Sequence, residues 1–125
     1  MNPRRFLESL KYALEGLEYC IKTQRNLRIH FIFAVAAILM SLILNISRIE
    51  FVLIVMVISL VIICEMINTA IERAVDTTTL EYHPIAKISK DVAAGAVLVS
   101  AINAIVVGWL ILGRYIWPIA RKIFD

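Results

Sequence analysis

The sequence predicts an all-α integral membrane protein with a single domain over residues 1–125, built from an N-terminal amphipathic surface helix and three transmembrane helices. Hydrophobic residues make up 61% of its 125 residues, a share too high for an ordinary soluble domain. A transmembrane helix needs about 20 mostly apolar residues. Three segments approach this length, at about residues 29–46, 49–72 and 92–113.

The charged N-terminal segment, at about residues 2–22, has the pattern of an amphipathic helix. Its charges recur at helical spacing between apolar side chains. Asn2 followed by Pro3 suits an N-cap and a first helical position. Such a helix lies in the plane of the membrane surface with its apolar side toward lipid, or it packs on the other helices as a lid. The pattern leaves both arrangements open.

The ends of the three apolar segments give a topology. The second segment continues without Gly or Pro into polar residues, and its helix should end near Thr78, before a loop over residues 77–89. The third is followed by basic and aromatic residues typical of an interface. The positive-inside rule places the N-terminus in the cytoplasm, because the next connection holds only Arg48, whereas six cations precede the first segment: Arg4, Arg5, Lys11, Lys22, Arg25 and Arg28.

The net charge of +3 does not indicate nucleic-acid binding. The cations lie next to the apolar segments, where anionic lipid head groups explain them more simply. Cys20 and Cys64 are far apart and match no metal-ligand or redox spacing. We therefore expect the bilayer, and no nucleic acid, to be the partner of the charged residues.

The most informative residues form a polar stripe on the second predicted span. At 100° per residue, its members fall within about 80° of one another on the helix: Glu65, Asn68, Glu72 and Asp76. Carboxylates at a membrane boundary are costly unless they are compensated. Mg²⁺ bound with substrate phosphates would compensate them, and a desolvated carboxylate can act as a general base toward a hydroxyl. A phosphoryl-transfer site requires both roles.

The polar stripe is also compatible with two roles that involve no catalysis. The acids can pair with Arg73, Lys87 and Lys90 and only fasten the helices together, or they can mark an ion pathway. Lys90 can neutralise a phosphate, whereas Asp91 beside it suits a cap at the start of the third helix. The preceding loop offers groups that can hold a nucleotide base, or it is simply solvated: Glu81, Tyr82 and His83.

Three stretches resemble the prokaryotic diacylglycerol kinase family over nearly the whole chain. EMINTAIERAVD and EYHPIAKISKDVAAGAVLV resemble its signature region, and KYALEGLEYCIKTQRNLRIHF resembles its surface helix and the start of its first span. The resemblance implies a lipid kinase of the bacterial inner membrane that uses ATP and Mg²⁺. It also implies a homotrimer whose active sites lie at the cytoplasmic interface and are shared between subunits.

The resemblance also implies roles for individual residues. Glu65 matches the catalytic base that takes the proton from the lipid hydroxyl, and Glu72 matches a carboxylate ligand of the Mg²⁺ bound with ATP. Asn68 and Asp76 match polar residues needed around this site. Besides Glu72, the positions that match nucleotide contacts are Arg5, Tyr12, Glu81, Tyr82, His83, Lys90 and Asp91.

Gln24 departs from the family pattern, because the family usually has a glutamate there that joins the Glu72 position in holding metal. An amide oxygen can still ligate Mg²⁺, although it attracts the ion less than a carboxylate does. We expect activity to be retained at this metal site; reduced or lost activity is the alternative.

The expected acceptor depends on the residues of the signature region. EYHPIAKISKDVAAGAVLV is more similar to Gram-positive-type members, which favour undecaprenol, than to members that favour diacylglycerol. We therefore predict undecaprenol as the acceptor and keep diacylglycerol as the alternative. A non-catalytic ion-binding or scaffold subunit with the same acids is the alternative of another class, and it would consume no ATP.

Overall fold

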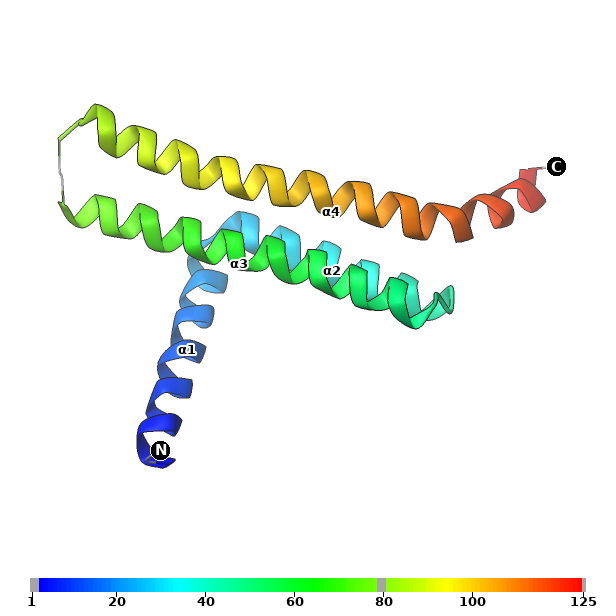
Figure 1. Cartoon of the computed structure of the whole chain (residues 1–125), viewed down its shortest axis with the longest axis horizontal. Coiled ribbons are helices and arrows are strands. Elements are labelled where there is room, and N and C mark those ends of the chain that lie inside the picture. Colours follow the sequence, from blue (N-terminus) through cyan, green and yellow to red (C-terminus); the bar gives the residue numbers. More distant parts are fainter. Residues whose placement is uncertain (1–2, 79–80, 125) are drawn as a thin grey trace.

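The chain folds into four helices, as a computed structural model that describes residues 3–78 and 81–124 shows (Figure 1). They are α1 (Pro3–Thr23), α2 (Arg25–Ile43), α3 (Arg48–Thr78) and α4 (Pro84–Phe124). The last three are long and apolar enough to cross a membrane. The predicted all-helical chain with three candidate spans is thus confirmed. The predicted N-cap, Asn2, and residues 79–80 of the predicted loop lie outside the described residues.

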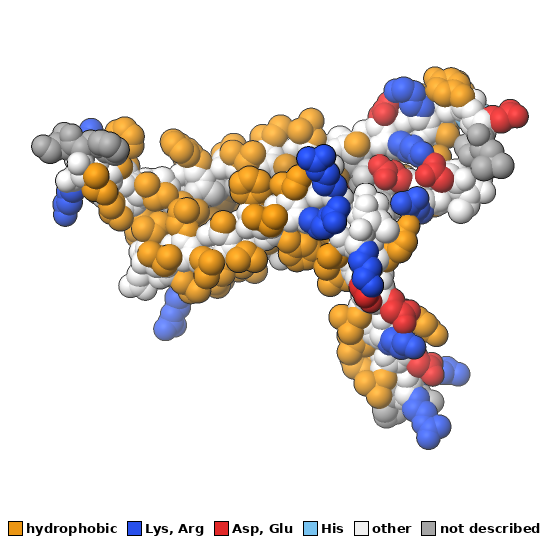
Figure 2. All heavy atoms as spheres, turned by 180° about the vertical axis from the view of Figure 1, so that it is seen from behind, with side chains coloured by type: hydrophobic (Ala, Val, Ile, Leu, Met, Phe, Trp, Pro, Cys, Tyr) orange, Lys and Arg blue, Asp and Glu red, His pale blue; other side chains and the backbone are white. Residues whose placement is uncertain are grey.

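The three long helices lie side by side, and α1 projects away from them at a steep angle (Figure 1). α3 packs along both neighbours, most extensively on α4, while α2 and α4 meet little. Hydrophobic side chains cover the long helices, whereas charged side chains gather on α1 and near the α3–α4 connection (Figure 2). Lipid is a suitable solvent for such an apolar surface, because helices satisfy their own backbone polar groups. The placement of α1 on a membrane surface stays a prediction.

The turn between α2 and α3 is fixed by two capping motifs. Asn45 adopts a left-handed conformation with φ 50°, and the N–H of Ile46 donates to the carbonyl of Ser41 at 3.3 Å, as in a Schellman motif. Ser47 and Glu50 then form a capping box. The Ser47 hydroxyl accepts from the Glu50 N–H at 3.3 Å, and the Glu50 carboxylate accepts from the Ser47 N–H at 3.0 Å.

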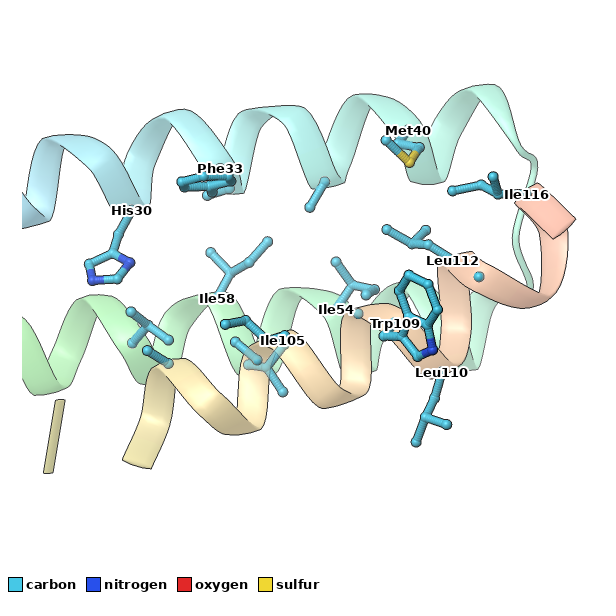
Figure 3. A pocket seen from close by; sticks show the side chains of 18 of the residues that line it. His30, Phe33, Met40, Ile54, Ile58, Ile105, Trp109, Leu110, Leu112 and Ile116 are labelled. Carbon is cyan, nitrogen blue, oxygen red and sulfur yellow. The ribbon is translucent and has the colours of Figure 1, made fainter. Parts of the chain in front are cut away.

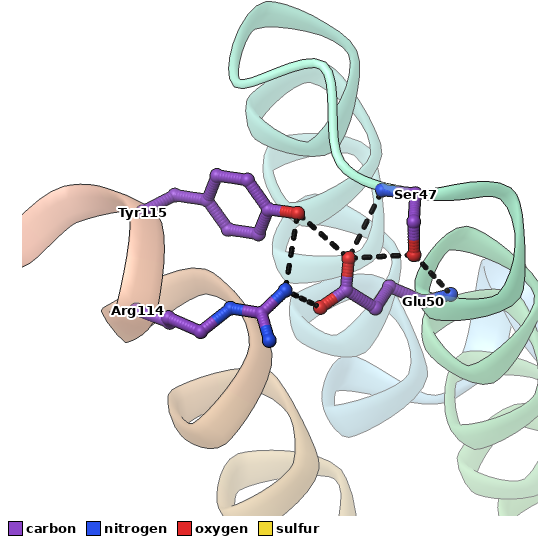
Figure 4. A network of polar contacts seen from close by, with 4 residues as sticks. All are labelled: Ser47, Glu50, Arg114 and Tyr115. Carbon is purple, nitrogen blue, oxygen red and sulfur yellow. Dashed lines mark hydrogen bonds and ion pairs between the residues drawn. The ribbon is translucent and has the colours of Figure 1, made fainter.

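The same Glu50 carboxylate ties the beginning of α3 to α4 (Figure 4). It accepts hydrogen bonds from the Arg114 guanidinium at 2.5 Å, the Tyr115 hydroxyl at 2.8 Å and the Ser47 hydroxyl at 2.7 Å. Its side chain is 14% exposed. Charge-assisted hydrogen bonds are stronger than neutral ones, so this cluster should hold the α3–α4 pair together at the end opposite the polar stripe.

We expect Glu50→Ala to lower the thermal midpoint of unfolding in detergent by roughly 5 °C, because four donors lose their acceptor. A thermal unfolding curve followed by circular dichroism measures this shift. The control is Glu15→Ala, which removes only an exposed pair with Lys11 on α1 and should leave the midpoint unchanged. Equal midpoints for both variants and the original chain would contradict a stabilising role for Glu50.

The boundaries of α4 differ from the expected ones. A loop was predicted up to Ser89 with Asp91 as a cap, but α4 begins at Pro84. Both predictions were wrong because Pro84 starts the helix instead of interrupting it. Proline suits the first helical position, where its missing N–H is not needed. Lys90 and Asp91 therefore lie about two turns inside α4.

α4 also continues past the residues expected to end its span. It runs through Pro118 to Phe124, for a length of 41 residues. A proline inside a helix removes one backbone hydrogen bond and clashes with the preceding turn, which bends the helix. Figure 1 shows α4 bent in this C-terminal part.

Candidate active site

α3 carries the polar stripe from the packed interior toward solvent. Glu65 is 4% exposed, Asn68 and Glu72 are half-buried, and Asp76 is exposed. Measured along the helix axis from Arg48, Glu65 lies at about 26 Å and Asp76 at about 42 Å, at 1.5 Å per residue. One helix thus places a buried carboxylate about three turns before an exposed one.

Glu65 is the buried carboxylate of the site. Its Oε1 lies 3.3 Å from Nε2 of His30 on α2, but the ring N–H is not aligned with it, and Oε1 has no hydrogen-bond partner among the described residues. Leaving a buried carboxylate oxygen unsatisfied is costly. The sequence patterns did not single out His30, although an ionisable side chain inside an apolar span is itself a signal of function.

Asn68 and Glu72 are joined one turn apart on α3. Nδ2 of Asn68 donates to Oε1 of Glu72 at 3.2 Å, while Oδ1 of Asn68 is buried and without a hydrogen bond from any residue that the structure describes. A carboxylate and an orphaned carbonyl oxygen are suitable ligands for a hard cation such as Mg²⁺. Residues 3–78 and 81–124 contain no cluster of three or more acidic, His or Cys side chains that could hold a metal. The two oxygens would supply only part of the ligands of Mg²⁺, so that substrate phosphates would have to supply others.

Gln24 lies at the same end of the molecule as Glu72. It precedes α2 as the N-cap residue, and its side-chain amide donates to the Thr23 hydroxyl at 3.4 Å. Just before it, the ring of Tyr19 lies 5.8 Å from the guanidinium of Arg73 on α3. The junction of α1 and α2 thus lies beside this part of α3, and joint metal binding by Gln24 and Glu72 stays a prediction.

Ion pairing explains one member of the polar stripe. Lys90 on α4 pairs with Asp76, and Lys87 donates to Asp91 one turn further along α4 at 2.5 Å. Within the described part of the chain, no ion pair joins Lys or Arg to either of the other two carboxylates of the stripe. A purely fastening role therefore suits Asp76 but leaves Glu65 and Glu72 without a cation.

The predicted nucleotide contacts that lie outside α3 and α4 fall into two groups. Glu81, Tyr82 and His83 are exposed in the connection before α4, and Nδ1 of His83 accepts a hydrogen bond from the Ile85 N–H at 3.2 Å. This connection follows the end of the polar stripe directly. Arg5 and Tyr12 are exposed on α1, which projects away from the bundle (Figure 1). The first group thus follows the stripe closely in the sequence, whereas the second lies on a different helix.

A cavity of about 830 Å³ lies between α2, α3 and α4. Its walls are almost entirely apolar, and it extends from His30 at one end to Trp109 and Ile116 at the other (Figure 3). Because α2 and α4 meet little, the cavity lies where the bundle is least closed. It is large enough for part of a long hydrocarbon chain.

Comparison with known proteins supports the resemblance found in the sequence. The family model for prokaryotic diacylglycerol kinase matches residues 11–112. The diacylglycerol kinase of Synechocystis sp. is 45% identical over 107 residues, which cover 85% of this chain and 61% of that protein, less than two thirds of it. The undecaprenol kinase of Bacillus subtilis is 38% identical over 86% of this chain and 87% of its own length. The diacylglycerol kinase of Escherichia coli K12 is 31% identical over 86% of this chain and 88% of its own length. This chain therefore belongs to the prokaryotic diacylglycerol kinase family.

Proposed function

We propose that this chain is an ATP-dependent lipid kinase of the bacterial inner membrane that phosphorylates undecaprenol. The family supports the lipid kinase class and favours an enzyme over an ion-binding or scaffold subunit. The observation that carries the proposal is the buried Glu65 carboxylate, with one oxygen unsatisfied by any described residue. A catalytic base must be available for a proton, and Glu65 is not engaged with a Lys or Arg that would hold it in an ion pair.

The reaction is a direct phosphoryl transfer. The lipid hydroxyl oxygen forms a bond to the γ-phosphorus of ATP as the bond to the bridging oxygen breaks, and ADP leaves. Glu65 accepts the hydroxyl proton. Such a transfer needs positioning, charge neutralisation and a base, so that no phosphorylated intermediate of the protein is required.

The more exposed end of the polar stripe faces the nucleotide in this proposal. Glu72 and the carbonyl oxygen of Asn68, with Gln24, would hold Mg²⁺, which neutralises phosphate charge when it is bound with ATP. Lys90 contacts a phosphate. It either leaves its ion pair with Asp76 to do so or keeps that ion pair at the same time. The remaining contacts to ATP are made by Arg5, Tyr12, Glu81, Tyr82, His83 and Asp91.

A homotrimer with sites shared between subunits accounts for the position of α1. Arg5 and Tyr12 lie on a helix that projects away from its own bundle, which suits contact with the nucleotide of a neighbouring subunit. The six cations before the first span support a cytoplasmic N-terminus, and with it a cytoplasmic α3–α4 connection, where ATP is available.

The apolar cavity supports a hydrocarbon acceptor, and two of the relatives favour a second candidate. The relative from Synechocystis sp. is named a diacylglycerol kinase, so diacylglycerol must be tested beside undecaprenol. The experiment measures transfer of labelled phosphate from Mg-ATP to each lipid separately by the purified protein. Faster labelling of undecaprenol supports the proposal, faster labelling of diacylglycerol reassigns the acceptor, and label in neither lipid contradicts the kinase.

Gln24→Glu tests the proposed metal site. We expect turnover to be unchanged or raised and the Mg²⁺ concentration at half-maximal activity to fall by roughly 5-fold, because a carboxylate attracts the ion more than an amide does. A Mg²⁺ titration of activity at fixed ATP measures this. Thr23→Glu is the matched control, since it adds the same charge one residue away. A large loss of activity in Gln24→Glu, or an equal shift in the control, would contradict a ligand role for position 24.

A further inference from the structure

The contact between His30 and Glu65 joins two ionisable side chains of different helices inside the bundle. His30 comes from α2 and Glu65 from α3, and Nε2 lies 3.3 Å from Oε1. This distance is within hydrogen-bond range, although the N–H direction is not aligned in this conformation. An imidazole N–H aligned at this distance would satisfy the carboxylate oxygen.

His30 also lies at the boundary between the carboxylate and the apolar cavity. Its side chain is 26% exposed, and it projects from α2 toward α3 at one end of the cavity (Figure 3). The other cavity-lining residues around it, Ile29 and Phe33, are apolar. The imidazole is therefore the one polar side chain at this end of the described cavity, and it is in contact with the proposed base.

A role in helix packing alone accounts poorly for this arrangement. An imidazole inside an apolar span is costly, and the contact leaves Oε1 of Glu65 without a hydrogen bond from any described residue. An apolar pair of similar volume would fasten α2 to α3 at least as well. Polar pairs of this kind are instead expected where a reactive group must be held in one orientation.

We propose that His30 is a positioning residue for the Glu65 carboxylate. Its Nε2–H donates to Oε1 and holds the carboxylate at the cavity end where the hydroxyl of a long-chain alcohol arrives. This proposal rests on the kinase function and on Glu65 as its base. His30 itself transfers no proton, because the hydroxyl proton goes to Glu65.

The test compares two substitutions of His30 with different hydrogen-bonding capacity. His30→Leu fills the space but has no donor, whereas His30→Gln carries an amide N–H near the position of Nε2. We expect kcat to fall by roughly 10-fold or more in His30→Leu, with KM for ATP unchanged, and to recover to within about 3-fold in His30→Gln. Ile32→Ala, on the same helix and with Ile32 70% exposed, is the control and should keep the original kcat.

Three results decide the proposal. Recovery in His30→Gln supports it, because a role in packing alone gives no advantage to an amide over leucine. An unchanged kcat in His30→Leu, or an equal loss in both variants, overturns it. Should His30→Leu not fold, His30→Asn, whose amide is too short to reach Oε1, takes its place in the same comparison.

Glu65→Gln separates this proposal from the proposed function. If Glu65→Gln retains turnover, the assignment of the base is wrong and the role of His30 falls with it. If Glu65→Gln is inactive while His30→Leu is fully active, the kinase assignment stands and only the positioning role is overturned.

Discussion

Replacing Glu65 by glutamine is expected to lower kcat by about 10²- to 10⁴-fold, the usual contribution of a general base. The amide keeps the shape of the side chain but cannot accept the hydroxyl proton. ATP binding should be unchanged, because Glu65 lies about two turns from Glu72 along α3. Phosphate transfer to the lipid measures the first effect, and equilibrium binding of a fluorescent ATP analogue measures the second.

The fold should survive this substitution. Glu65 is 4% exposed, and its Oε1 lacks a hydrogen bond within the described chain. Glutamine therefore removes a poorly compensated charge, and the Glu65→Gln variant should unfold at the same temperature as the original chain or at a higher one. Glu15→Gln makes the same chemical change on exposed α1 and should keep full turnover. Turnover at the original rate in Glu65→Gln would mean that another group is the base.

Replacing Glu72 by glutamine is expected to weaken Mg-ATP binding by roughly 10-fold or more, with a smaller loss of kcat at saturating Mg²⁺. The substitution removes the charged ligand of the proposed metal site while leaving an oxygen that can accept from Asn68. Binding of ATP in the presence of Mg²⁺, and separately in the presence of a chelator, measures the effect. The original chain should bind ATP more tightly than Glu72→Gln in the presence of Mg²⁺. The two should bind ATP with the same affinity in the presence of the chelator.

Excess Mg²⁺ distinguishes the roles of the two carboxylates. It should restore much of the activity of Glu72→Gln, because mass action offsets a weaker site. It should restore none of the activity of Glu65→Gln, which lacks a proton acceptor. A Glu72→Gln variant with an unaltered Mg²⁺ requirement would contradict the ligand role.

The parts of the molecule that depend on local helix geometry were predictable from the sequence. Three apolar segments gave three long helices, and the end of α3 at Thr78 is confirmed. Spacing alone placed Glu65 and Glu72 on the same side of α3, because residues of one helix keep a fixed angular relation. The start of α4 was misplaced because Pro84 suits both a helix interruption and a first helical position.

The contacts between helices were not predictable in the same way. Neither the partner of Glu65 nor that of Glu50 follows from periodicity, because both depend on how far one helix is shifted along another. His30 and Glu65 lie on different helices, and Glu50 and Arg114 are 64 positions apart in the sequence. The spacing of apolar and polar residues determines which face of a helix is buried. It does not determine the position along the helix axis at which two helices contact each other.

The apolar walls of the cavity have a consequence for selectivity. A lipid tail that leaves the bilayer for this cavity exchanges one hydrocarbon environment for another, so that burial alone supplies almost no net free energy of transfer. Chains of different length and branching are then weakly discriminated by the walls. Preference between a prenyl alcohol and a diacylglycerol must instead arise at the polar side chains of the cavity, which are Arg114 at one end and His30, in contact with Glu65, at the other.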